Sequence, residues 1–241
     1  MIEAFKKYVS NYDMEISGIK LKYDHSFRVM SLSEKYALKL NFSEEDVYLA
    51  KLIGLLHDIG RFEQMKVYNT FVDKKSIDHA DYSVDRLFNH NEIKLFHDNE
   101  EDYDVIKLAI KNHNKLEITG AKTERELMHC RLIRDTDKID IVYNWAHLGF
   151  INYAEDGSEI SPEVLENLKN HKSISHSIVK TKSDRIACTY AFVFDTNYDE
   201  CLKEIKQYLD DKYESFEHKE VLKEMKEIVD NYVDERLGIK I

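Results

Sequence analysis

The fold is decided by the stretch at residues 55–61, which reads Leu55-Leu56-His57-Asp58-Ile59-Gly60-Arg61. An imidazole and a carboxylate stand side by side here, at the end of an apolar run that resembles a helix. Burying such a pair among leucine and isoleucine side chains is costly unless the groups share a proton, a partner or a metal ion. Gly54 lies three residues before His57, where a missing side chain would let another helix approach closely.

Other ligand-type side chains lie in the same kind of apolar frame. On a helix, His25 would share its face with Leu21 and Val29, each four residues away. Asp137 has an isoleucine four residues before it and another four residues after it, and His113 follows a similar apolar face. We therefore expect four separate segments to direct one or two ligand-type groups each toward the interior.

The order of these groups along the chain resembles the HD-domain superfamily of metal-dependent phosphohydrolases. The matching stretches lie at residues 23–29, 55–61, 78–83, 110–114 and 134–140, and the resemblance spans roughly residues 20 to 145, about half of the chain. His79 and His113 match the two additional histidines of the binuclear branch, so the resemblance implies two metal ions. The only proline is Pro162, and the Gly-Tyr-Pro signature of the branch that cleaves cyclic dinucleotides is absent.

The resemblance also implies which residues hold each ion. The first ion would be bound by His25, His57 and Asp137, and the second by His79 and His113, with Asp58 bridging the two. Position in the family pattern favours Asp137 as the last ligand, with Asp135 as the alternative. Imidazole and carboxylate ligands without a thiolate suit Fe, Mn, Zn, Co or Ni, whereas a pure Mg site would normally have more oxygen ligands.

The expected function is metal-dependent hydrolysis of a small phosphoester or nucleotide by a water activated at a binuclear site. Two divalent ions would neutralise both the attacking and the leaving oxygens, so no protein nucleophile is required. Asp58, Arg61 and Lys138 are the expected catalytic residues. Arg61 could reach a substrate phosphate or form a surface ion pair, and Lys138 could contact substrate or pair with Asp135 or Asp140.

Two other function classes remain open from the sequence. A minority of HD-domain proteins with a similar ligand set are di-iron oxygenases, which need iron that cycles between redox states. A ligand-binding or signalling module with an inert metal site is the third reading, although all six ligand positions are filled here.

Bulk composition sets wider limits. The chain has 241 residues, 7 glycines, 1 proline and a formal net charge of -11. These values favour one sizeable helical core and argue against binding to nucleic acid or an anionic membrane. The three cysteines lack the spacing of a zinc finger, and no signal peptide or membrane-spanning run is visible, so we expect a cytoplasmic protein. The oligomeric state is left open, and a homodimer is compatible with the sequence.

We expect an all-α fold, an HD-domain helical bundle with a helical C-terminal extension. The bundle would occupy residues 1–150, and residues 151–241 would form the extension packed on the same domain. Ser43 would cap a helix that ends at the His-Asp pair with Gly60 as its stop, followed by an ordered loop at 61–77. Asp78 would cap the helix beginning at His79, and Thr123 would open a long helix carrying Asp137.

The remaining helices are expected from their periodicity. They lie at residues 2–12, 20–40, 161–171, 198–212 and 217–236, with another, carrying His113, after the acidic residues 98–104. Residues 188–194 alternate aromatic and small side chains as a strand would, yet no second strand is available to pair with them. A helix or an irregular buried segment is therefore favoured there.

Overall fold

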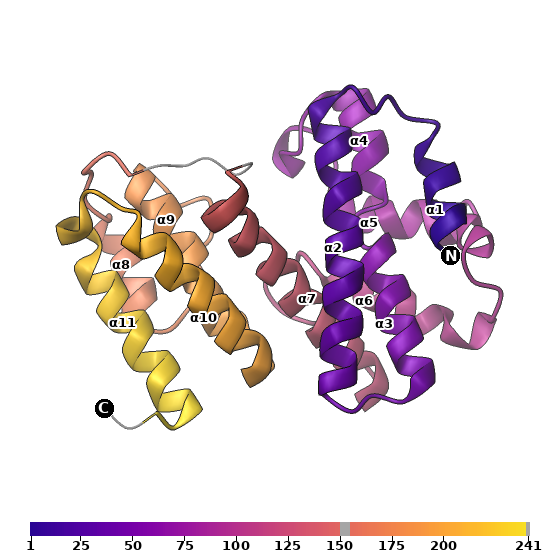
Figure 1. The fold of residues 1–241 in the computed structure, drawn as a ribbon. Coiled ribbons are helices and arrows are strands. Elements are labelled where there is room, and N and C mark those ends of the chain that lie inside the picture. Colours follow the sequence, from indigo (N-terminus) through magenta and orange to yellow (C-terminus); the bar gives the residue numbers. More distant parts are fainter. Residues whose placement is uncertain (150–154, 240–241) are drawn as a thin grey trace. The chain divides into compact units, whose positions relative to one another are not determined.

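A computed structural model describes residues 1–149 and 155–239, and every regular element in these ranges is a helix (Figure 1). The predicted all-α class is confirmed. The chain divides into two compact units, Met1–Asp137 and Lys138–Ile241. The boundary expected between residues 150 and 151 lies outside the described residues. None of the helices in the described ranges is both long and apolar enough to span a bilayer.

The first unit contains the predicted site and is built from short helices around one apolar core. Its α-helices are α1 (Ile2–Val9), α2 (Ser17–Lys39), α3 (Glu44–Leu56), α4 (Gly60–Tyr68), α5 (His79–Val84), α6 (Tyr103–Asn112) and the first part of α7 (Glu124–Tyr143). Shorter helical turns are η1 (Asp73–Lys75), η2 (Asp85–Asn89), η3 (Glu92–Leu95) and η4 (Glu100–Asp102). The core buries side chains from α1 to α7, among them Phe5, Leu52, Phe62 and Ile133.

Three of the predicted helix starts are confirmed. The Ser43 hydroxyl accepts a hydrogen bond from the backbone N–H of Asp46, which begins α3. The Asp78 carboxylate accepts from two backbone N–H groups of α5, and Thr123 Oγ1 accepts from the Glu126 N–H at the start of α7. Each cap satisfies donors that the first helical turn leaves without a partner, so these short polar side chains set the helix boundaries.

Helices α2 and α3 lie side by side (Figure 1), and the backbone of α2 passes close to Gly54 of α3. A Cβ atom at Gly54 would lie 3.0 Å from Met30 Cα, 3.0 Å from Val29 O and 2.8 Å from Ser33 Oγ. Two of these neighbours are backbone atoms of α2 and cannot rotate away. The close helix contact predicted from the sequence is thus present, and it holds α3 against the helix that carries His25.

Replacing Gly54 with alanine should therefore destabilise the chain. Overpacking a core typically costs about 1–3 kcal/mol. That loss exceeds the gain of up to about 1 kcal/mol that alanine provides over glycine inside a helix. Chemical denaturation should show a lower free energy of unfolding for Gly54→Ala than for the wild type.

Gly18 provides the matched control, because it lies in α2 and its added Cβ would meet a flexible side chain. The close atom there is Met65 Cε at 2.6 Å, the far end of a side chain that can rotate. Gly18→Ala should cost clearly less stability than Gly54→Ala. Equal losses would show that the close backbone contact at Gly54 is not what limits the substitution.

Gly60 does not stop a helix, so that prediction is wrong. It is the first residue of α4, and residues 60–68 are helical, where the sequence indicated a loop from 61 onward. A Cβ at Gly60 would lie 2.8 Å from the backbone nitrogen of Ser83 and 3.0 Å from the carbonyl oxygen of His79. The glycine is required by the close approach of α5, which a local sequence pattern does not reveal.

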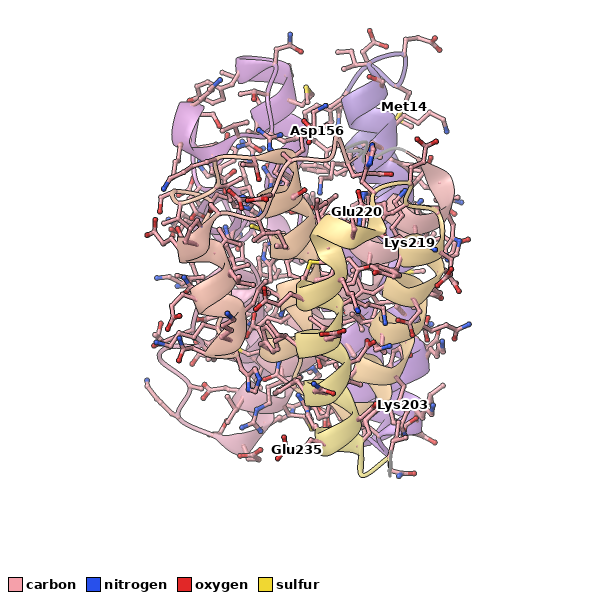
Figure 2. All side chains as sticks on the ribbon, turned by 90° about the vertical axis from the view of Figure 1, so that its left-hand side faces the viewer. Met14, Asp156, Lys203, Lys219, Glu220 and Glu235 are labelled. Carbon is pink, nitrogen blue, oxygen red and sulfur yellow. The ribbon has the colours of Figure 1, made fainter. Side chains whose placement is uncertain are left out.

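The second unit holds the end of α7 and the remaining helices. These are η5 (Asn144–Leu148), α8 (Pro162–Lys169), α9 (Lys182–Tyr190), η6 (Ala191–Asp195), α10 (Asp199–Glu214) and α11 (Lys219–Leu237). The helices expected at 161–171, 198–212 and 217–236 are confirmed, and residues 188–194 are helical. Figure 2 labels Lys219 and Glu220 at the start of α11 and Glu235 near its end.

The repeat of buried residues explains how α11 packs in this unit. Its buried side chains are Leu222, Met225, Val229 and Val233, spaced three or four residues apart along one face. Charged residues occupy other faces, as at the exposed Glu220 and Glu235 (Figure 2). Lys206 and Lys226 each form ion pairs with both Asp210 and Asp230, which joins α10 to α11.

Candidate metal centre

The first unit brings all six predicted ligand residues together from five segments. His25 lies in the middle of α2, His57 caps the end of α3 with Asp58 next to it, and His79 begins α5. His113 caps the end of α6, and Asp137 lies in α7. The four histidines and Asp58 are each no more than 6% exposed. Burial of this many polar groups at one place calls for compensating partners.

One side of the cluster pairs His25 with His57. The Nε2 atoms of the two rings lie 3.2 Å apart. Asp137 Oδ1 lies 3.2 Å from Nε2 of His25 and 3.7 Å from Nε2 of His57. Asp58 Oδ2 approaches the same two nitrogens at 3.5 and 3.6 Å. Asp137, the aspartate favoured from the sequence, therefore lies beside His25 and His57.

The other side of the cluster pairs His79 with His113. Their Nε2 atoms lie 3.0 Å apart, and Asp58 Oδ1 lies 3.5 Å from the first and 3.6 Å from the second. Asp58 thus presents one carboxylate oxygen to each pair of histidines. A carboxylate in this position has the geometry of a group that can bridge two ions.

The hydrogen bonds behind the rings fix which nitrogen carries the proton. Nδ1 of His57 lies 2.9 Å from the carbonyl oxygen of Gly54, and Nδ1 of His113 lies 2.7 Å from that of Ile110. A carbonyl oxygen can only accept, so each Nδ1 donates its hydrogen and each Nε2 is left with a free lone pair. The Nε2 atoms that point into the cluster are the atoms free to bind a metal ion.

The donor set fits a metal ion on three grounds. Groups of three ligand atoms lie within 4.8 Å of one another, including His25, His57 and Asp58 on one side and Asp58, His79 and His113 on the other. Asp58 Oδ1 is buried and has no hydrogen-bond partner among the described residues. Opposed imidazole lone pairs and an unpartnered carboxylate oxygen are unfavourable inside a protein unless a cation lies among them.

The protonation states suit metal binding. Desolvation raises the pKa of Asp58, but the charge of Lys22 and the nearby histidines more than offset this, so its pKa lies well below the ordinary value. Burial also raises the pKa of Asp137, but its contacts with His25 and His57 more than offset this, so that pKa too lies well below the ordinary value. Desolvation lowers the pKa of His57, and lowers that of His79 to about 4. At neutral pH the carboxylates are charged and these two rings neutral, as metal ligands must be.

Two residues that contact the cluster were not predicted from the sequence. Lys22 Nζ donates to Asp58 Oδ2 at 2.6 Å, and Asp73 Oδ2 lies 2.6 Å from Nδ1 of His79. Lys22 lies three residues before His25 on α2, and this helical spacing was an available signal. Asp73 lies in a segment that was read as a loop, and no periodicity marks it.

Arg61 lies beside the cluster and is largely buried, with a side chain 13% exposed. Its Nη1 donates to Gln64, to the carbonyl oxygen of Phe71 and to Asp73. Its Nε lies 3.6 Å from Asp58 Oδ1 and makes no hydrogen bond among the described residues. Arg61 thus lies close to the cluster, as the sequence suggested. Its side chain is held there by hydrogen bonds to Gln64, Phe71 and Asp73.

Lys138 is placed differently from the expectation. It belongs to the second unit, where its Nζ donates to the carbonyl oxygen of Asp195 and pairs with the carboxylate of the same residue, both at 2.8 Å. Of the two alternatives that the sequence left open for Lys138, the ion pair with Asp135 or Asp140 is replaced by one with Asp195, and the substrate contact stays a prediction. The actual partner lies 57 residues along the chain, beyond the reach of any helical spacing.

The chain matches a known protein family over part of its length. The family described as HD domain matches residues 23–142, a range that contains all six residues of the cluster. No curated protein and no solved structure matches the chain.

Proposed function

The chain belongs to the HD domain family through residues 23–142, and from this premise we propose that it is a phosphohydrolase with two metal ions, acting on a small phosphoester or nucleotide. Metal-dependent hydrolysis is the general activity of the family. The proposal adds the bond that is cleaved, the class of substrate and the number of ions.

The position of Asp58 carries the proposal. Its Oδ2 faces His25 and His57, and its Oδ1 faces His79 and His113. The first ion would be held by His25, His57 and Asp137, the second by His79 and His113, and both by Asp58. Divalent ions bound in this way supply the positive charge that activates water and neutralises the oxygens of a phosphoryl transfer.

The hydrogen bonds around the cluster support the second ion in particular. Nδ1 of His113 donates to a carbonyl and Nδ1 of His79 faces a carboxylate, so both Nε2 atoms are acceptors. They nevertheless lie only 3.0 Å apart. Two acceptors at that distance repel each other, and a cation bound between them and Asp58 would remove the repulsion. The imidazole and carboxylate set favours Fe, Mn, Zn, Co or Ni over Mg.

The chain's own residues would bind the substrate phosphate beside Asp58. Lys22 and Arg61 both lie there, and each places its charged group over the ring of Phe71, at 5.7 and 5.5 Å from the centroid. These cations offset the carboxylates of the cluster in a chain of net charge -11. Lys138, the third residue expected to act in catalysis, pairs with Asp195.

The test is metal analysis followed by a phosphoester panel. Protein purified without added metal should contain or take up about two transition-metal ions per chain. Nucleoside monophosphates, nucleoside triphosphates, dinucleoside polyphosphates and simple phosphoesters should include at least one substrate. Chelation should abolish the hydrolysis, and added Mn²⁺ should restore it. Hydrolysis that survives chelation, or a metal-loaded protein that turns over no phosphoester, would contradict the proposal.

Replacing Arg61 with lysine should lower catalytic efficiency on the preferred phosphoester about tenfold, or roughly 1.4 kcal/mol in transition-state stabilisation. Lysine keeps the charge but loses the planar fork that can donate two parallel hydrogen bonds to a phosphate. Steady-state kinetics and metal content should be measured together. Unchanged kinetics would remove Arg61 from substrate binding, and loss of metal would show that it acts through the residues it holds.

A further inference from the structure

His79 differs from His57 and His113 in how its ring is held. The other two rings each follow the last turn of a helix and donate Nδ1–H to a carbonyl oxygen three residues earlier. His79 is the first residue of α5, so no turn of its own helix precedes it. Its Nδ1 instead lies 2.6 Å from Oδ2 of Asp73, in the short turn η1. A side chain thus replaces the backbone partner that the helix start cannot supply.

The rest of the Asp73 carboxylate is held by donors from α4. Its Oδ1 accepts from Arg61 Nη1 and from Gln64 Nε2, both at 3.0 Å. Gln64 is fully buried and also donates to the carbonyl oxygen of Ile77 at 3.1 Å. Because Oδ1 is occupied by these two donors, Oδ2 is the oxygen left for His79.

Among the described residues, the competing polar contact to this nitrogen comes from Asn114, and it is the longer one. Its Nδ2 lies 3.4 Å from Nδ1 of His79 but donates to Asp78 Oδ1 at 3.1 Å. An Nδ1 that carried no proton could accept from Asn114, yet it would then face the Asp73 carboxylate with its lone pair at 2.6 Å. The shorter contact requires a proton on Nδ1.

We infer that Asp73 is a positioning residue of the metal centre, which holds His79 with its proton on Nδ1 so that Nε2 faces His113 and Asp58. The inference rests on the metal centre of the proposed function and adds a residue that acts on that centre through His79. Carboxylates behind a ligand histidine fix its tautomer and orientation, and their loss typically lowers metal affinity about 10- to 100-fold.

The substitution Asp73→Asn tests this sharply, because asparagine has one acceptor oxygen where aspartate has two. Arg61 Nη1 and Gln64 Nε2 can only donate hydrogen bonds. The single oxygen of the asparagine should therefore take the Oδ1 position, where it accepts from both. The NH₂ group would then face Nδ1 of His79 as a donor. The ring must respond by moving its proton to Nε2, the atom that should bind the ion.

Two measurements read out the change without any assay of hydrolysis. Nitrogen NMR of the metal-free wild type should show His79 protonated on Nδ1, and in Asp73→Asn the proton should move to Nε2. Titration with Co²⁺ alone should show the more weakly held of two ions bound at least about tenfold less tightly in Asp73→Asn. Asp81→Asn is the matched control, since it removes an exposed carboxylate of α5 that pairs with Lys115.

A double-mutant cycle separates positioning from a general effect on the fold. In a His79→Ala background, Asp73→Asn should cause no further loss of Co²⁺ binding. The same loss in both backgrounds, or an unchanged tautomer and affinity in Asp73→Asn, would overturn the inference. If Asp73→Asn does not fold, the wild-type NMR measurement decides alone, because a proton found on Nε2 of His79 contradicts the inference.

The outcome is distinguishable from failure of the proposed function. A chain that binds two ions and shows the Asp73 dependence but hydrolyses no phosphoester would refute the reaction and leave this inference intact. A chain that hydrolyses phosphoesters, but whose His79 tautomer and Co²⁺ binding do not depend on Asp73, would refute this inference and leave the proposed reaction intact.

Discussion

Asp58→Ala should abolish hydrolysis and remove both metal ions from the protein. Asp58 faces both pairs of histidines, with its two oxygens 3.5 to 3.6 Å from four Nε2 atoms. Its loss leaves each pair without the shared negative charge that an ion needs. We expect metal affinity and turnover to fall by more than the roughly 10- to 100-fold that loss of an outer partner costs. Metal analysis after dialysis and a phosphoester assay provide the measurements.

Asp24→Ala is the control for this variant. Asp24 lies next to His25 but is 40% exposed and pairs with Lys20 on the surface of α2, so its removal should change neither metal content nor activity. Helicity by circular dichroism should remain close to that of the wild type in both variants, since no helix cap is lost. An Asp58→Ala protein that kept two ions and normal turnover would refute the bridging role.

The parts of the fold that were predictable are those governed by neighbours in sequence. Ser43 and Asp78 cap helices because a short polar side chain reaches backbone N–H groups two or three residues on. The close helix contact at Gly54 was predictable because a glycine three residues before His57 leaves room for another helix to approach. Gly60 was misread because glycine at the end of a helix usually stops it, whereas here it admits the backbone of Ser83.

The same division holds at the metal centre. His25, His57, His113 and Asp137 lie in or directly after helical stretches with apolar residues at helical spacing, and the match to the HD domain contains all six predicted ligands. Asp73 and the true partner of Lys138 were not predictable in this way, whereas Lys22 could have been found from its three-residue spacing to His25 on one helix. The contacts of Asp73 and Lys138 join residues 6 and 57 positions apart outside any helical repeat, so only the tertiary structure brings them together.

His79→Ala and His113→Ala should each reduce the metal content from about two ions per chain toward one and strongly impair hydrolysis. These histidines face Oδ1 of Asp58, whereas His25 and Asp137 lie on its other side and should keep their ion. Metal analysis after dialysis against a defined concentration of free Mn²⁺ gives the stoichiometry. His90→Ala is the control, because that histidine is 56% exposed and pairs with Asp85 on the surface.

The stability that metal binding adds to the folded chain provides an independent measure of how many ions are bound. An ion that binds only the folded chain adds about 2.7 kcal/mol to the free energy of unfolding when its free concentration is 100 times the dissociation constant. Under such conditions the wild type should gain roughly twice as much stability from Mn²⁺ as either variant does. If both variants keep the wild-type gain and metal content, the chain holds its metal through His25, His57, Asp58 and Asp137 alone, since the second pair would then contribute no binding energy.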